Sequence, residues 1–145
     1  MSRLVIDASV TLSWLLPDEG GASALAVRDE LLKAESVWAP AHWRLEVCNS
    51  LWMAEKRKRL DARGIARAVA LFTQLPITVD GETNDRAGGE TLELARQHTL
   101  SVYDAAYLEL ALRRGAVLGS LDGQLRSAAK KVGVPILPRN LPAES

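Results

Sequence analysis

Short apolar runs alternate along the chain with longer segments in which apolar residues recur every three or four positions. The short runs are typical of buried strands, and the longer segments of amphipathic helices. The runs predict five strands, at residues 3–6, 36–39, 76–79, 116–119 and 134–137. Because a helical segment separates each strand from the next, we expect parallel pairing with helices on both faces of the sheet. The pattern therefore predicts an α/β fold, a three-layer α/β/α sandwich around a parallel sheet of about five strands.

The helical segments begin and end at residues that favour helix termini. Asp61 is an expected N-cap, and Gly115 is expected to end a helix. The pair Gly88-Gly89 is expected to form a loop or to interrupt a helix. The predicted helices span residues 8–15, 23–33, 42–59, 62–75, 82–98, 104–114 and 121–132. Because the chain has no linker, repeat or low-complexity segment, residues 1–145 are predicted to form one domain, with a loose tail after about residue 138.

Composition narrows the class of protein. A length of 145 residues suits one domain, and a hydrophobic fraction of 48% argues against long disorder. The formal net charge is zero, which gives no overall attraction to nucleic acid or membrane but can hide local patches. No stretch approaches the ~18–20 apolar residues of a membrane span, and Asp7 interrupts the first apolar run too early for a secretion signal. The single Cys48 favours a cytoplasmic location and is expected to be buried on a helix.

Four acidic residues lie beside apolar runs, where carboxylates are costly unless a cation compensates for them. Asp7 and Asp122 each follow a predicted strand, Asp104 begins a predicted helix, and Glu46 lies in a helix among apolar neighbours. Ligands of parallel sheets bind at the carboxyl ends of strands, near a switch in strand order, which favours Asp7 and Asp122 as site residues. Taken singly, each Asp is more simply explained as a helix N-cap, and Glu46 as a surface residue. The spacing alone does not bring all four together.

A divalent cation is the partner that best suits such a group of acids. Without a cation, crowded carboxylates repel one another and some become protonated. Hard oxygen ligands suit Mg²⁺ or Mn²⁺, and a water retained by the metal can become a nucleophile while the metal neutralises charge on a phosphate. The acids therefore predict a metal-dependent enzyme, with either one or two ions.

Three polar residues near these acids are candidates for supporting roles. Ser9 and Ser120 each lie two residues from an acid, and their hydroxyls could hydrogen-bond a carboxylate or a metal-bound water, with a turn or capping role as an equal alternative. Asn49 lies three residues after Glu46, on the same helix face, and is a candidate to orient a carboxylate or to contact substrate.

Other residues carry weaker signals. His42 and His98 lack the spacing of a metal pair and are expected to be incidental. Asp80 also follows a predicted strand, but Gly81 and the polar residues after it indicate an exposed turn, so Asp80 is left out of the site. There is no glycine-rich nucleotide motif, and therefore no support for a nucleotide cofactor.

A basic run lies between residues 56 and 67. Its six cationic residues against the one acid Asp61 are Lys56, Arg57, Lys58, Arg59, Arg63 and Arg67. Such a run can match a helix dipole or bind nucleic-acid phosphates, and the sequence favours neither. Arg113, Arg114 and Arg126 are candidates to extend this surface.

Four segments carry a recognisable pattern. They are Val5-Ile6-Asp7-Ala8-Ser9-Val10, Leu45-Glu46-Val47-Cys48-Asn49-Ser50-Leu51, Tyr103-Asp104-Ala105-Ala106-Tyr107-Leu108-Glu109-Leu110-Ala111, and Leu118-Gly119-Ser120-Leu121-Asp122 with Leu125. In this order, over nearly the whole chain, they resemble the PIN-domain ribonucleases, and more narrowly the VapC toxins of bacterial toxin–antitoxin pairs. Two small departures are Ser120, where the family often has Thr, and Gly119, where Ala is commoner.

The resemblance implies a Mg²⁺- or Mn²⁺-dependent endoribonuclease that leaves a 5′-phosphate. Asp7, Glu46, Asp104 and Asp122 match the family's acidic quartet. Asp7 and Asp104 would be the firmest metal ligands, Asp122 would support a ligand or a second metal, and Glu46 would orient water or metal. The implied partners are an RNA substrate, a second copy in a homodimer, and an antitoxin whose tail, often through Arg, enters the acidic cleft.

Two other functions compete with this interpretation. An aspartyl-phosphate phosphatase or phosphoacceptor domain would use Asp7 as its nucleophile, but Ser9 stands where phosphatases of the Asp-x-Asp type have a second Asp. A non-catalytic partner-binding module that kept a PIN-like fold is disfavoured because all four acids are present.

Overall fold

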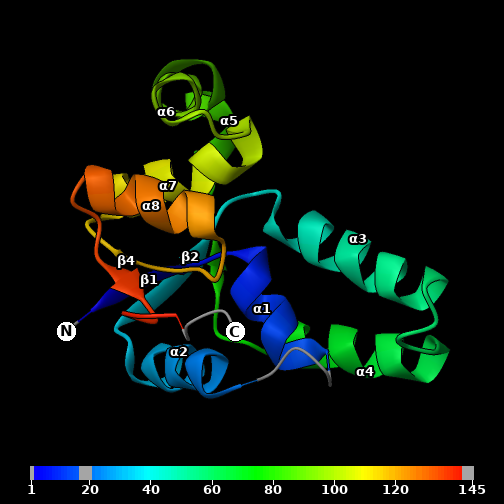
Figure 1. The fold of residues 1–145 in the computed structure, drawn as a ribbon. Helices are drawn as coiled ribbons and strands as arrows, with labels where there is room; N and C mark the ends of the chain where they lie inside the picture. The colour runs from blue at the N-terminus through cyan, green and yellow to red at the C-terminus, as the bar shows by residue number, and fades with distance from the viewer. Residues whose placement is uncertain (1, 17–20, 142–145) are drawn as a thin grey trace.

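The computed structural model describes residues 2–16 and 21–141, and its centre is one parallel sheet (Figure 1). The strands are β1 (Arg3–Ile6), β2 (Ser36–Ala39), β3 (Thr78–Val79), β4 (Val117–Gly119) and β5 (Ile136–Leu137). Their order is β3-β2-β1-β4-β5, and every pair is parallel. Because β1 has β2 on one side and β4 on the other, the switch in strand order lies between β1 and β4. The predicted α/β class and five-stranded parallel sheet are confirmed.

Helices cover both faces of this sheet. They are α1 (Ala8–Leu15), α2 (Ala22–Lys33), α3 (Trp43–Lys56), α4 (Ala62–Thr73), α5 (Thr83–Arg86), α6 (Leu92–His98), α7 (Val102–Arg114) and α8 (Gly123–Lys131). Helices α7 and α8 lie on one side of the sheet and α2 lies on the other, which gives the predicted three layers (Figure 1). Within the described residues, no helix has both the length and the apolar character needed to cross a bilayer.

Helix α7 is the central helix of the molecule. It packs on β1 and β4 on one side and contacts α6 and α8 on others. Every residue from Ala105 to Ala111 is buried. A helix covered on all sides has apolar or small residues all round, which explains the Ala-Ala-Tyr-Leu sequence after Asp104. Asp104 therefore directly precedes the buried segment of this helix.

The chain between residues 82 and 98 differs from the single helix predicted there. Helix α5 ends at Arg86, a π-helical turn η1 (Ala87–Thr91) follows, and α6 then continues. Gly89, inside this turn, has φ −109° and ψ −108°, outside the helical region. Each glycine weakens a helix by about 1 kcal/mol relative to alanine. The predicted interruption at Gly88-Gly89 is confirmed.

Helices α3 and α4 form an arm that projects from the body of the molecule (Figure 1). Trp43 and Phe72 pack edge to face across it, with ring centroids 5.8 Å apart. Val47 and Leu51 continue the buried face of α3. Cys48 is on the opposite side and is exposed, so the prediction of a buried cysteine is wrong.

Candidate active site

Asp7 lies at the carboxyl end of β1 and is the N-cap of α1. Its side chain is buried, with 4% of its surface exposed. Its Oδ1 accepts hydrogen bonds from the Val10 backbone N–H at 3.0 Å and from the Ser9 hydroxyl at 2.6 Å, and its Oδ2 accepts one from the Ser120 hydroxyl. A carboxylate offers about four acceptor positions. These three hydrogen bonds use three of the positions, which leaves part of Oδ2 free for another ligand.

The register of the sheet explains the contact between Asp7 and Ser120. The last residues of β1 and β4 pair with one another, so the next residues, Asp7 and Ser120, lie side by side just beyond the sheet. The Ser120 hydroxyl accepts from the Asp122 N–H at 3.0 Å, and the Ser9 hydroxyl accepts from the Leu121 N–H at 2.9 Å. The two serines therefore tie the loop after β4 to Asp7.

Burial dominates the electrostatics of Asp7. Loss of hydration raises the pKa of Asp7 from 3.8 to about 6, although hydrogen bonds from Ser120, Ser9 and Val10 act in the opposite direction. The charge of Asp122 adds to the rise in this pKa. Because lost hydration is the main cause of the rise, a cation beside Asp7 would lower its pKa and favour the ionised carboxylate.

Asp122 and Asp104 lie near the N-termini of the two helices on one face of the sheet, α8 and α7. Asp122 is the N-cap of α8, where its Oδ1 accepts from the Leu125 N–H at 3.0 Å. Helix α7 begins at Val102, two residues earlier than predicted, because Ser101 is the N-cap, and Asp104 lies in its first turn. Burial raises the pKa of Asp104, and the charges of Asp122 and Glu46 raise it further.

Glu46 lies in the first turn of α3, close to α7. It accepts a hydrogen bond from the buried Tyr107 hydroxyl at 2.6 Å, and His42 Nε2 lies 3.2 Å from its Oε1. The same His42 nitrogen lies 3.0 Å from the Tyr103 carbonyl oxygen. Both neighbours are acceptors, so Nε2 carries the proton. Burial acts to raise the pKa of Glu46, but the hydrogen bonds from His42 and Tyr107 outweigh it, so this pKa is lowered.

The four acids form a row across the ends of β1 and β4 and the starts of α7 and α3. Asp7 interacts electrostatically with Asp122, Asp122 with Asp104, and Asp104 with Glu46. That all four bind one metal site stays a prediction. In the part of the chain that the structure describes, no three carboxylate, imidazole or thiol side chains are arranged as a ready-made metal cage.

This row fits a hydrated cation better than an enclosed one. Its donors are hard carboxylate oxygens, and burial is the main cause of the raised pKa values of Asp7 and Asp104, which a bound cation would lower. Mg²⁺ keeps several of its waters and usually binds through one or two carboxylates, so it does not need a complete protein cage. Asp7 and Asp104 are the residues that would hold such an ion. Asp122, whose charge interacts with both of them, would support it.

Several other placements differ from the sequence predictions. His42 is not incidental, because it contacts Glu46. Arg126 does not extend a basic surface: it is buried and donates to the Ser120 carbonyl oxygen at 3.0 Å, close enough to Asp7 to interact with its charge. Its position four residues after Asp122, on the same face of α8, is the signal that could have revealed it. Asn49 is exposed, and no hydrogen bond of its side chain is recorded among the described residues.

Comparison with known proteins adds an independent observation. The model of the PIN-domain family matches residues 4–131. The chain belongs to the PIN-domain family. Ribonuclease VapC3 of Mycobacterium tuberculosis is 31% identical over 126 residues, which cover 87% of each protein, and this identity and coverage place the chain with the VapC-type members.

Solved structures agree on the PIN-domain fold. Mycobacterium tuberculosis VapC20, described as a sarcin-ricin loop cleaving toxin, superimposes with a TM-score of 0.61 at 19% identity, covering 96% of this chain and 99% of that one. VapBC2 from Rickettsia felis, bound to a DNA fragment from their promoter, gives a TM-score of 0.62 at 11% identity, covering 92% and 96%.

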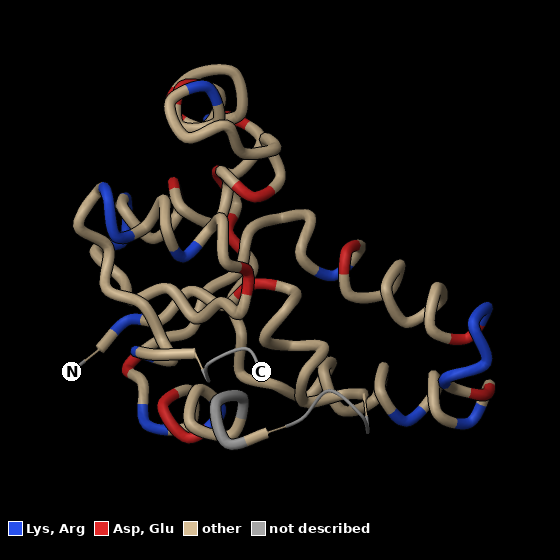
Figure 2. Tube along the Cα trace, viewed as in Figure 1, with Lys and Arg blue, Asp and Glu red and all other residues tan. Residues whose placement is uncertain are grey.

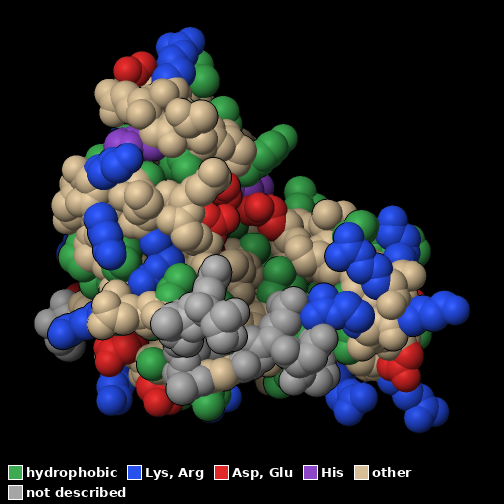
Figure 3. Space-filling model, in the orientation of Figure 1, with side chains coloured by type: hydrophobic (Ala, Val, Ile, Leu, Met, Phe, Trp, Pro, Cys, Tyr) green, Lys and Arg blue, Asp and Glu red, His purple; other side chains and the backbone are tan. Residues whose placement is uncertain are grey.

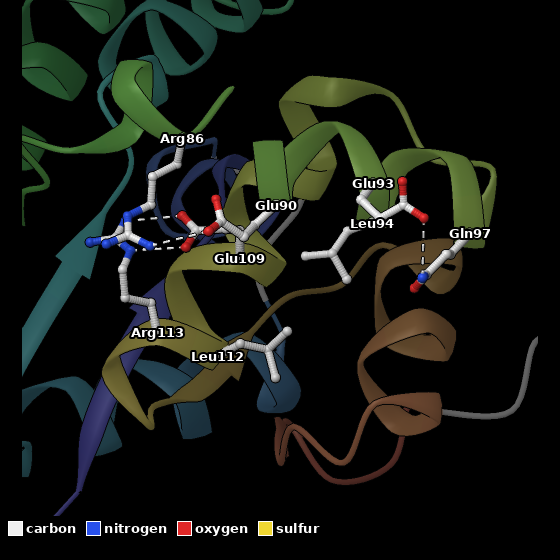
Figure 4. A pocket seen from close by; sticks show the side chains of 8 residues that line it. All are labelled: Arg86, Glu90, Glu93, Leu94, Gln97, Glu109, Leu112 and Arg113. Atoms are coloured by element: carbon white, nitrogen blue, oxygen red, sulfur yellow. Dashed lines mark hydrogen bonds and ion pairs between the residues drawn. The ribbon is translucent and has the colours of Figure 1, made fainter. Parts of the chain in front are cut away.

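The PIN domain also contains a cavity of about 480 Å³ that none of the four acids lines (Figure 4). The arginines that line this cavity form hydrogen bonds or ion pairs with nearby carboxylates. Arg113 forms two hydrogen bonds with Glu109 and two with Asp80, and Arg86 lies near Glu90. Asp80 is 2% exposed, so the prediction that it lies in an exposed turn is wrong. It is a structural partner of Arg113, and Arg113 for that reason does not extend a basic surface.

Proposed function

We propose that this PIN-domain protein is an endoribonuclease, the toxin of a toxin–antitoxin pair, and that it hydrolyses RNA phosphodiester bonds at its row of acids. The observation that carries the proposal is the row itself, Asp7, Asp122, Asp104 and Glu46, at the strand-order switch of a PIN fold. This is the edge at which ligands of parallel sheets bind.

Each residue of the row has a separate task. When bound by Asp7 and Asp104, with Asp122 in support, Mg²⁺ or Mn²⁺ would supply an activated water and neutralise charge on the phosphate. Glu46 stays ionised at neutral pH because His42 and Tyr107 donate to it, so it can accept a hydrogen bond from the attacking water. The products would carry a 5′-phosphate.

The supporting residues act on Asp7 rather than on RNA. Ser9 and Ser120 fix the orientation of its carboxylate through their hydroxyls. The same hydrogen bonds disfavour the phosphoacceptor alternative, because both oxygens of Asp7 accept hydrogen bonds and are weaker nucleophiles for it. Asn49, which is exposed on α3, is proposed to contact substrate.

The proposed partners follow from the family and from charge. An antitoxin is supported by the VapBC2 relative, and a guanidinium from its tail would satisfy the acids that lack a cation. We also propose a homodimer and a cytoplasmic location. The cytoplasmic location is proposed because a single cysteine cannot form a disulfide within the chain.

The test is metal-dependent cleavage of RNA by purified protein, together with sequencing of RNA 5′ ends after brief expression. Asp7→Asn and Asp104→Asn are expected to lower the rate by at least about 100-fold, because each removes a proposed metal ligand. Glu93→Gln, which neutralises an exposed carboxylate on α6, is the matched control and should cut normally. Retained cutting in both Asp variants would refute the assigned roles.

A further inference from the structure

A basic patch covers the free end of the α3–α4 arm. All six of its side chains are exposed, and we call them the arm tip: Lys56, Arg57, Lys58, Arg59, Arg63 and Arg67. Figure 2 shows Lys and Arg positions along the end of the arm, and Figure 3 shows their side chains exposed there, whereas acidic side chains gather near the centre of the same face, where the arm meets the body. In the described part of the chain, Arg57, Lys58, Arg63 and Arg67 have no carboxylate partner.

Helix stability does not account for the arm tip. Lys56 lies in the last turn of α3, where a cation suits the helix dipole. Arg63, in contrast, lies in the first turn of α4, where the dipole disfavours positive charge, and it repels Arg67 as an i, i+4 pair. Lys58 holds φ 61°, a conformation that favours glycine. Lys58, Arg63 and Arg67 therefore lower the stability of the arm, so an anionic partner is the better explanation.

The outer face of α3 connects the arm tip with the row of acids. Leu45 and Trp52 are 75% and 52% exposed, and they lie two turns apart on this face with Asn49 between them. Lys56 Nζ lies 5.4 Å from the centre of the Trp52 ring. An exposed aromatic ring beside a cation and an amide suits unpaired bases, which stack on aromatic side chains while phosphates follow basic ones.

The length of α3 sets the distance between the two charged regions. Glu46 is in the first turn and Lys56 is the last residue of the helix, ten residues later. At 1.5 Å per residue they are about 15 Å apart along the axis. A short single-stranded segment can span this distance, with its scissile phosphate at the acids and a neighbouring phosphate at the arm tip.

We propose that the outer face of α3 and the arm tip form a binding track for single-stranded RNA on one side of the cleavage site. Trp52 stacks on an unpaired base, and Arg57, Arg63 and Arg67 hold phosphates. This inference rests on the proposed RNA-cleaving function, which places the scissile phosphate at the acids. Binding of RNA to the track does not itself require cleavage.

The first test measures binding of a fluorescent single-stranded RNA in EDTA, where cleavage is absent. The triple variant Arg57→Ala, Arg63→Ala, Arg67→Ala is expected to bind at least about 10-fold more weakly at low salt, and its log–log salt slope should fall by about 2, since each lost contact removes about 0.7. The matched control removes three exposed lysines elsewhere, Lys33, Lys130 and Lys131. Equal losses in both triple variants would overturn the proposal, because they would show only the effect of net charge.

The second test uses Trp52. Trp52→Ala is expected to weaken binding of single-stranded RNA by about 5-fold or more, because one stacked base is lost, and to leave duplex binding unchanged. Leu32→Ala, at another exposed apolar helix position, is the control. An unchanged affinity for single strands, or preferential binding of an acidic peptide at the arm tip, would overturn the proposal.

Cleavage assays with Mg²⁺ separate this inference from the proposed function. The triple arm-tip variant should raise KM and leave kcat within about 2-fold, because it removes binding that is equal in ground and transition states. Specific binding through the arm tip without any cleavage supports the track and refutes the nuclease assignment. Cleavage with an unchanged KM in the triple variant refutes the track alone.

Discussion

Asp7 is the residue on which the proposed chemistry of the site depends. Its carboxylate is buried at the switch point, and its pKa is held near 6 by a balance between lost hydration and three hydrogen bonds. Ser120 is the largest of the contributions that lower this pKa, and the strand register fixes it beside Asp7. A serine hydroxyl is thus what keeps this buried acid available as an anion.

Ser120→Ala should raise the pKa of Asp7 above 6. Removing a donor to the carboxylate destabilises its charged form, so the direction of the change is upward. The measurement is an NMR titration of the metal-free protein with labelled Asp carboxyl carbons. Ser127→Ala, at an exposed position on α8, is the control and should leave Asp7 unchanged. An unchanged or lower pKa of Asp7 in Ser120→Ala would contradict the account.

At the scale of elements, β3 is anchored to α7 by a buried ion pair. Arg113 holds both oxygens of Asp80 at 3.0 and 2.7 Å, and Thr83 donates to the same carboxylate. Burial acts to raise the pKa of Asp80, but the hydrogen bonds from Arg113 and Thr83 and the charge of Arg113 outweigh it and lower this pKa to about 2. The two-residue strand β3 therefore depends on a contact outside the sheet.

This ion pair predicts a loss of stability in acid. Because the folded-state pKa of Asp80 is depressed, its contribution is complete above pH 3.8 and disappears as the pH falls through about 2. The contribution is on the order of 2 kcal/mol in the free energy of unfolding. Urea unfolding between pH 2 and 7 measures it. Asp80→Asn should have a lower free energy of unfolding at pH 7 than Asp85→Asn, which changes an exposed residue and is the control. The free energy of unfolding of Asp80→Asn should also fall less steeply as the pH is lowered. Identical pH profiles for the two variants would rule out this role.

The strands and most helices could be predicted because each has a local signal. Apolar runs mark all five strands, and Asp61 marks the start of α4. Asp80 and Cys48 were assigned to the wrong environments because their burial depends on distant partners: Arg113 lies 33 residues beyond Asp80, and α4 decides which side of α3 faces outwards. His42 was missed although the predicted helix 42–59 already placed it four residues before Glu46, because its spacing was compared only with that of a metal pair.

At the scale of the whole molecule, a net charge of zero conceals two separated regions of opposite sign. The acids lie where four chain segments meet, and the arm carries the cations about 15 Å away along α3. An RNA strand is attracted to the arm tip and repelled by the acids unless a cation is present. In the proposed mechanism, productive contact between a phosphate and the acids therefore depends on binding of a divalent ion.

The most direct test of this central claim is calorimetric titration of the metal-free protein with Mn²⁺. We expect saturable binding to the unmodified chain and affinity at least about 10-fold lower in both Asp7→Asn and Asp104→Asn, with Glu93→Gln unchanged. Undetectable binding to the unmodified chain, or equal affinity in all four proteins, would contradict the account.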